Sequence, residues 1–180
     1  MRVGLMVAVL ALFGAGPALA QVTSAVEIGV GYAYLRDEEI DESFPLGGYV
    51  DIAGNLNDWL GLVGEFGASF KTIDSGIGDE ELDIDLKIYS AMGGFRLNRR
   101  GDSANFYVQL LAGAATAKLT FLDEADSVTD FALQPGVGLE FGGGSTRLRI
   151  GGDYRHIFSE GESASQWRAT AGIVFGLGER

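Results

Sequence analysis

The chain has no cysteine, one histidine and only three prolines among its 180 residues. Without cysteine it can form no disulfide, no thiolate metal site and no lipid-modified cysteine behind an export signal. A single histidine, His156, leaves too few nitrogen ligands for a transition-metal site. No glycine-rich loop precedes a helical pattern, so the P-loop and dinucleotide motifs are missing as well. We therefore expect no metal and no cofactor.

Basic residues are also scarce. The chain has 13 Lys and Arg against 25 Asp and Glu, which gives a formal net charge of -12. Phosphate backbones are bound by clustered Lys and Arg, so no nucleic-acid partner is expected. Long hydrophobic runs are missing too, because glycine or a charge interrupts every apolar stretch after residue 20. A transmembrane helix needs about 20 apolar residues, so none is predicted.

The start of the chain has the pattern of a secretory signal. A basic start is followed by an apolar stretch at residues 3–13, and residues 18–20 form an A-x-A cleavage site. The apolar stretch is too short to be a membrane-spanning helix. We therefore expect residues 1–20 to be a cleaved signal peptide and residues 21–180 to be one domain.

Glycine, in contrast, is abundant, with 28 residues. Scattered glycines disfavour long helices and suit strongly curved strands. Residues 166–175 show the pattern that recurs along the chain. Their odd positions read Trp, Ala, Ala, Ile and Phe, and their even positions read Gln, Arg, Thr, Gly and Val. Successive side chains of a strand point to opposite faces, so this strand has one apolar face and one polar face.

Eight segments alternate in this way, and most have the 9–11 residues that a tilted strand needs to cross a bilayer. They are residues 24–35, 46–56, 59–72, 84–97, 105–120, 130–141, 146–158 and 166–175. The links after the second, fourth and sixth are short and the others are long, as in barrels with short periplasmic turns and long outer loops. The predicted fold is an all-β, eight-stranded antiparallel up-and-down transmembrane barrel in a Gram-negative outer membrane.

Two points of this prediction stay open. Residues 84–88 have reversed polarity, which indicates either a β-bulge or a part that projects beyond the bilayer. Residues 98–102 are polar and are expected to form a turn. The competing fold is a soluble lipocalin-like barrel, which would hold its apolar faces inside and its charges outside.

The polar faces of the segments carry equal numbers of acids and arginines. An eight-stranded barrel is just wide enough for side chains to fill, and buried charges must pair. We therefore predict a plugged, ion-paired interior, with a narrow selective channel as the alternative. The residues of this predicted network are Glu27, Asp51, Glu65, Arg96, Glu140, Arg147, Arg149, Asp153, Arg155 and Arg168.

The long links hold 17 of the 25 acidic residues. Such runs are usually a solvated, repulsive surface, and we expect acidic outer loops here. A divalent-cation site is the sharper alternative, although no loop has the spacing of a calcium motif. The acids are Asp37, Glu38, Glu39, Asp41, Glu42, Asp74, Asp79, Glu80, Glu81, Asp83, Asp85, Asp123, Glu124, Asp126, Asp130, Glu160 and Glu162.

Four segments resemble the small outer-membrane β-barrel domain family, the porin-family or opacity-type proteins related to the OmpA membrane domain. They are Tyr49–Phe66 with its Asn57-Asp58-Trp59 turn, Gly93-Gly94-Phe95-Arg96, Leu148–Arg155 and the terminal strand Arg168–Phe175. The resemblance covers roughly residues 26–175. It implies a monomeric eight-stranded barrel, usually without catalysis, that has a structural or surface-interaction role.

The resemblance also implies partners. Outer-membrane lipid and lipopolysaccharide would surround the barrel, and the barrel-assembly machinery would read the terminal aromatic, Phe175, during insertion. Family members normally end at this aromatic, whereas here residues 176–180 follow it.

An enzymatic alternative rests on the single histidine. Some outer-membrane barrels hydrolyse envelope lipid, and a lipid A deacylase-like site would need a serine, a histidine and a carboxylate near the outer rim. His156 is expected there on the outward face, with Ser159 and Glu160 or Glu162 nearby. Residues two apart share a strand face, but His156 and Ser159 are three apart. A non-catalytic interfacial histidine is therefore the favoured interpretation.

Overall fold

The computed structural model describes residues 24–77, 80–101, 103–121, 124–159 and 163–179, and their regular structure is entirely β. The expected signal peptide, residues 1–20, lies outside this range. No helix in the described part is long and apolar enough to cross a membrane. The strands are β1 (Ser24–Asp37), β2 (Glu42–Phe44), β3 (Leu46–Asn55), β4 (Leu60–Ile77), β5 (Glu80–Arg100), β6 (Ala104–Phe121), β7 (Glu124–Phe141), β8 (Thr146–Phe158) and β9 (Ser163–Glu179).

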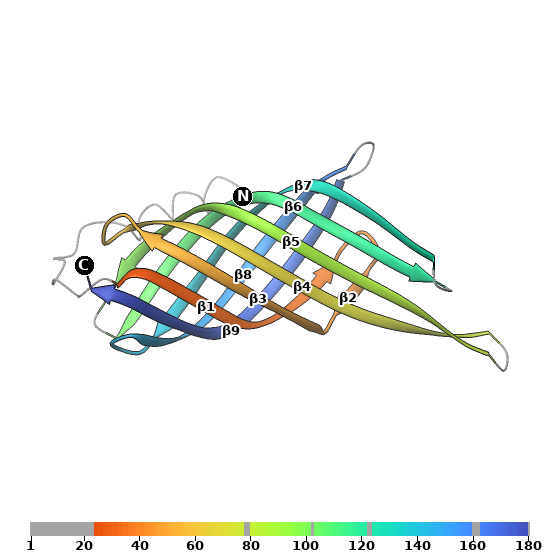
Figure 1. Ribbon diagram of the computed structural model, residues 1–180, viewed down its shortest axis with the longest axis horizontal. Coiled ribbons are helices and arrows are strands. Elements are labelled where there is room, and N and C mark those ends of the chain that lie inside the picture. Colours follow the sequence, from red (N-terminus) through yellow and green to blue (C-terminus); the bar gives the residue numbers. More distant parts are fainter. Residues whose placement is uncertain (1–23, 78–79, 102, 122–123, 160–162, 180) are drawn as a thin grey trace, which may run out of the picture.

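Eight of these strands close into a barrel. Each pairs antiparallel with its neighbour along the chain, and β9 returns to pair with β1 (Figure 1). Val30 of β1, for example, lies opposite Val50 of β3 on one side and Ile173 of β9 on the other. The short strand β2 is the exception, because it pairs only with β1. The predicted fold class, a closed eight-stranded antiparallel barrel, is confirmed.

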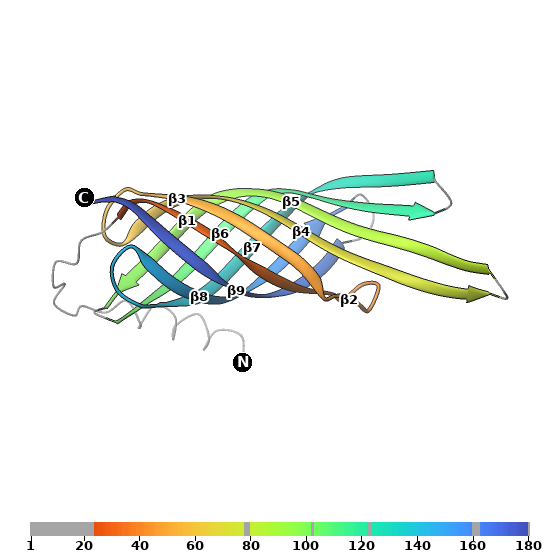
Figure 2. The same ribbon diagram turned by 60° about the horizontal axis from the view of Figure 1, so that its bottom comes forward.

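Two hairpins extend past the barrel wall at the end opposite the C-terminus, as Figures 1 and 2 show. β4 pairs with β3 only as far as Phe70, and its outer part pairs with β5 alone. β7 likewise pairs with β8 only from Phe131 onward. The sequence pattern predicts long loops at these tips, but strands continue through most of them.

The segment with reversed polarity contains no bulge. β5 keeps one register with β4 from Glu80 to Leu97, so the bulge, one of the two alternatives for residues 84–88, is wrong. Ile88 faces inward, where it is buried in a cluster with Leu35 and Phe44, and Leu86 packs against this cluster. The polarity reverses because the outer end of the lumen is apolar, while its middle is charged.

The turn expected at residues 98–102 is also shorter than predicted. β5 continues through Arg100, and Asn98 pairs with Tyr107 of β6. Polar side chains here face the lumen rather than the solvent, so their polarity does not indicate a turn. The terminal strand is longer as well: β9 runs past Phe175, and Leu177 pairs with Val26 of β1.

The two faces of the wall have opposite character. Outward apolar side chains are exposed, including Phe66 at 63 %, Leu148 at 62 % and Val137 at 48 %. The inward face buries charged side chains instead, among them Arg96 and Glu140. A soluble lipocalin-like barrel has the reverse arrangement. The exposed apolar belt requires an apolar surrounding, as a membrane barrel has.

Candidate functional site

The middle of the lumen contains ion pairs that connect strands on opposite sides of the barrel. Arg149 of β8 donates from Nη1 to Asp51 Oδ2 of β3 at 2.5 Å and from Nη2 to Glu140 Oε1 of β7 at 2.7 Å. Arg96 of β5 reaches the other oxygen of Asp51 at 3.3 Å. The four side chains are almost completely buried. Asp51 therefore links three strands through two guanidinium groups.

A tyrosine and an amide complete this layer. Arg96 donates to Gln109 Oε1 at 2.9 Å, and Gln109 donates in turn to Asp153 at 3.1 Å. The guanidinium carbons of Arg96 and Arg149 lie 4.7 and 5.3 Å from the ring centre of Tyr107. Gly138 makes room for this ring, because a Cβ there would collide with it.

A second group of pairs lies beside the first. Arg168 donates from Nη2 to Glu65 Oε1 at 2.6 Å and to Asp153 Oδ2 at 3.0 Å. Gln134 also donates to Glu65 Oε1, at 3.0 Å. Because Asp153 accepts from both Arg168 and Gln109, this group is continuous with the layer around Asp51.

Glu27 binds two arginines toward the end of the barrel where the short turns lie. Its Oε1 is 2.8 Å from Arg147 Nη2 and 3.1 Å from Arg100 Nη1. Neither Glu27 oxygen has hydrogen-bond geometry with these groups, and Asn98 Nδ2 of β5 likewise has no hydrogen-bond partner among the residues that the structure describes. Buried polar atoms of this kind are usually satisfied by ordered water. Arg147 also donates to Glu140, at 2.9 Å.

Arg155 is the exception among the predicted network residues. It is 3 % exposed, and its guanidinium donates to Gln134, Gln166 and Ser90 at 2.9 to 3.2 Å. Within the described residues it has no carboxylate within ion-pair distance. Gln166 connects Arg155 to a carboxylate, because its Nε2 donates to Asp37 Oδ2 at 2.8 Å.

The structure thus brings nine of the ten predicted network residues into direct ion pairs and connects Arg155 through amides. The amides Gln109, Gln134 and Gln166 were not predicted, since neutral side chains do not enter a count of charges. Arg100, which was expected in a turn, and Asp37, which was expected in a solvated loop and is 6 % exposed, were not predicted either.

The candidate hydrolase residues are not assembled as the sequence suggested. Ser159 donates from Oγ to Asp130 Oδ2 at 2.5 Å, and Glu160 and Glu162 lie outside the described residues. His156 lies across from Ser165 of β9, with 3.5 Å between Nδ1 and Oγ. Ser165 is also 2.7 Å from the hydroxyl of Tyr154. No carboxylate in the described part of the chain orients the imidazole.

The terminal aromatic is on the outward face. Phe175 of β9 is 41 % exposed and lies opposite Ile28 of β1 and Thr146 of β8. It is therefore at the end of the barrel that carries the short turns, where an aromatic girdle would meet the membrane interface.

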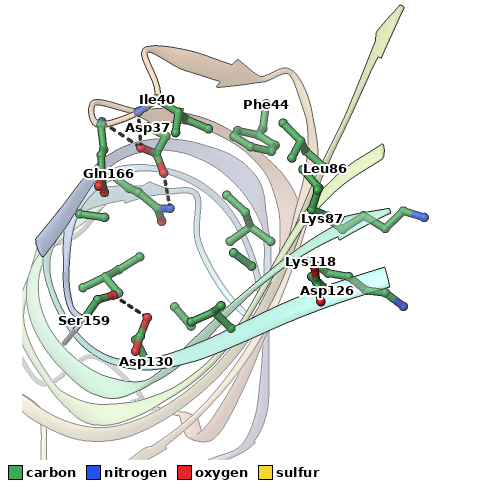
Figure 3. Close-up of a pocket in the computed structure, with 18 residues that line it drawn as sticks. Asp37, Ile40, Phe44, Leu86, Lys87, Lys118, Asp126, Asp130, Ser159 and Gln166 are labelled. Atoms are coloured by element: carbon green, nitrogen blue, oxygen red, sulfur yellow. Dashed lines mark hydrogen bonds between the residues drawn. The ribbon is translucent and has the colours of Figure 1, made fainter. Parts of the chain in front are cut away.

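At the other end a cavity of about 400 Å³ opens inside the wall. Its floor is formed by buried apolar side chains of Phe44, Ile88, Ala115 and Ile157. Figure 3 shows polar side chains at two places on its wall: Asp37 with Gln166, and Asp130 with Ser159. Lys87 and Lys118 also border the cavity, but their amino groups point away from it (Figure 3).

Two carboxylates beyond the wall have a lowered pKa. A hydrogen bond from Lys71 lowers the pKa of Glu42 in β2, and hydrogen bonds from Thr72 and Lys87 lower the pKa of Asp85. Both carboxylates are in contact with water, so these shifts reflect local partners and not burial. No group of three His, Cys, Asp or Glu side chains in the described ranges could hold a metal ion.

Several solved barrels share this fold. Ail, the attachment invasion locus protein of Yersinia pestis, solved with the heparin analogue sucrose octasulfate, is 24 % identical with a TM-score of 0.57 over 85 % of this chain and 99 % of Ail. Neisserial surface protein A is 13 % identical with a TM-score of 0.71 over 86 % and 98 %. The N-terminal barrel of Pseudomonas aeruginosa OprF is 15 % identical with a TM-score of 0.52 over 86 % and 98 %.

No curated protein matches the chain. The family described as "Outer membrane protein beta-barrel domain" matches residues 5–177, which is nearly the whole sequence. The closed barrel, its charged lumen and its apolar outer face agree with this match, and the chain belongs to the outer-membrane protein β-barrel domain family.

Proposed function

We propose that the protein is a non-enzymatic outer-membrane barrel with a closed lumen, whose acidic outer hairpins have a structural or surface-interaction role. The observation that carries the proposal is the set of ion pairs across the barrel, centred on Asp51 and Arg149. Side chains that fill an eight-stranded barrel leave no room for a wide pore. Because these carboxylates and guanidinium groups are already paired with one another, few charged groups remain to bind an ion in the lumen.

Surface charge supports the choice of partners. With a formal net charge of -12, the chain is poorly suited to a sulfated ligand of the kind crystallised with Ail. We expect the barrel to be a monomer that contacts outer-membrane lipid and lipopolysaccharide, and the assembly machinery during insertion. The expected export by residues 1–20 is part of the same proposal.

Conductance in a planar bilayer tests the closed lumen. The folded barrel should show no large, steady conductance, whereas a general porin in the same bilayer gives the reference current. Porin-scale currents from the pure protein would contradict the proposal. Small, selective currents would favour the narrow channel instead.

The hydrolase alternative has one observation in its favour. His156 and Ser165 are opposed on the outward face, where a lipid substrate would lie. Purified protein incubated with lipopolysaccharide should release no fatty acid. Release that is lost in His156→Ala and Ser165→Ala, with the barrel still folded, would overturn the non-enzymatic assignment.

A further inference from the structure

Two carboxylates of β7, those of Asp126 and Asp130, line the cavity at the outer end. The ion pairs near this end use other carboxylates, in Arg36–Asp41, Lys71–Glu42 and Lys87–Asp85. Among the described residues, Asp126 and Asp130 take part in no ion pair. Their charge is therefore not balanced within the cavity.

Asp37, on the opposite side, differs in this respect. Its Oδ1 accepts from the backbone amides of Glu39 and Ile40, and its Oδ2 accepts from Gln166. Gln166 in turn accepts from the guanidinium of Arg155. Asp37 and Arg155 are thus connected through a single amide, and a ligand is not needed to balance this carboxylate.

Asp130 has an open coordination side. Ser159 donates to Oδ2, while Oδ1 accepts no hydrogen bond from the described part of the chain. Figure 3 shows this carboxylate at the wall of the cavity, beside Ser159 and well apart from Asp37. The amino groups of Lys87 and Lys118 point outward and cannot fill this position. A group that binds here would carry a positive charge and hydrogen-bond donors.

The floor determines the rest of the ligand. Phe44, Ile88, Ala115 and Ile157 are between 1 and 9 % exposed and present no polar side-chain atom. A hydrated metal ion would gain nothing from these surfaces, whereas a hydrocarbon or aromatic group would. A cavity of about 400 Å³ is within the size range of small-molecule sites.

We propose that this cavity binds an amphiphilic organic ammonium ion, with the ammonium at Asp130 and the apolar body on the floor formed by Phe44, Ile88, Ala115 and Ile157. The site opens at the end that carries the long hairpins, away from the short turns. The ammonium position at Asp130 takes no part in the ion pairs of the lumen, which the cavity borders only through Asp37 and Gln166. The proposal holds whether or not the barrel conducts ions.

A matched series of probes tests the charge. The mature barrel in nanodiscs of zwitterionic lipid is titrated with 4-phenylbutylamine, 4-phenylbutanol and 4-phenylbutyrate, which differ only in the polar end. Methyl NMR shifts of Ala115 and Ile157 report on occupation of the cavity. The amine should bind about tenfold more tightly than the alcohol, as one charge-assisted hydrogen bond provides, and the carboxylate should not bind.

Substitutions then test the location. Asp130→Asn should remove the preference for the amine while leaving the affinity for the alcohol unchanged. Asp85→Asn is the control, because it removes the same charge from the outer end without lining the cavity. Ala115→Phe should fill the floor and abolish binding of every probe. Heat-modifiable gel mobility verifies that each variant is folded.

Three results would overturn the proposal. Equal affinities for amine and alcohol would show that Asp130 contributes nothing. Loss of amine preference in Asp85→Asn as well would mean that overall charge, and not the site, attracts the probe. Shifts confined to outward methyls such as those of Ile150 and Ile173 would place the probe in the lipid.

Discussion

Arg149 lies between two carboxylates in the middle of the lumen and is 2 % exposed. Its removal leaves Asp51 and Glu140 with fewer partners, and an uncompensated buried charge is costly. We expect Arg149→Leu to lower the free energy of unfolding by about 3–5 kcal/mol, measured by urea titration in detergent micelles. Arg36→Leu is the control, because the Arg36–Asp41 pair is solvent-exposed. Equal, small losses in both variants would show that lumen water already screens Arg149.

Val137 tests the lipid-facing side of the same wall. It lies in the part of β7 that pairs with both neighbours, opposite Val108 and Gly152, and its side chain is 48 % exposed. We expect Val137→Arg to lower the free energy of unfolding by about 2–4 kcal/mol, because folding would transfer the charged guanidinium from water to the bilayer midplane. Thr129→Arg is the control in the same strand, since Thr129 shares the outward face of Val137 but pairs with β6 only and lies beyond the closed wall. A neutral Val137→Arg would mean that this side chain does not face lipid.

Among the elements, β2 is joined to β4 by the ion pair between Glu42 and Lys71. A hydrogen bond from Lys71 lowers the pKa of Glu42 below its ordinary value of 4.5. Because the folded-state pKa is the lower one, the stabilisation is present above about pH 4.5 and is lost as the pH falls through the folded pKa. An NMR titration of the Glu42 carboxyl carbon should show this lowered pKa and its return to the ordinary value in Lys71→Met. Lys118→Met is the control. If the Glu42 carboxyl has the same pKa in Lys71→Met as in Lys118→Met, the assignment of the shift to Lys71 is contradicted.

The end of β9 is the second element with a testable role. If the assembly signal is internal, Phe175→Ala should lower the folded fraction in outer membranes, read by protease resistance. Deletion of residues 176–180 should leave that fraction unchanged or raise it. Phe141→Ala is the control, because Phe141 is an equally exposed aromatic, at 42 %, beside a short turn. If the deletion abolishes assembly and Phe175→Ala does not, the five-residue tail carries the signal, through pairs such as Leu177 with Val26.

Strand positions inside the wall could be predicted because the alternation has a physical cause there. Lipid selects apolar residues on one face, and the narrow lumen selects small or paired polar ones on the other. The same rule assigned inward positions to Glu65 and Arg96 correctly. Beyond the closed wall this selection is absent, and residues 73–77, which continue β4, were expected to be part of a loop. The reversed polarity of residues 84–88 reflects an apolar cluster that no single segment reveals.

The candidate site was predictable only where charge marked it. A count of acids and arginines identified Asp51 and Arg149, but it could not choose their partners, because those contacts cross the barrel. Gln109 and Gln134 carry no charge and were invisible to the same count. The outer cavity was not predicted at all, since its floor is assembled from four strands whose residues are ordinary core residues in sequence.

At the scale of the whole molecule, closure and polarity together determine where the barrel is stable. The β1–β9 pairing leaves the wall without an open edge. An open edge would expose backbone N–H and C=O groups for which the bilayer core offers no hydrogen-bond partner. The apolar belt outside and the ion pairs inside then require lipid around the wall and side chains within it. We expect the folded protein to fractionate with outer membranes and to migrate differently on a gel before and after boiling. The boiled sample is the internal control, because heat separates the β1–β9 pair and exposes the charged lumen. Recovery of folded protein in the soluble periplasmic fraction would contradict the membrane assignment, since water would then have to cover the exposed apolar belt that includes Phe66, Val137 and Leu148.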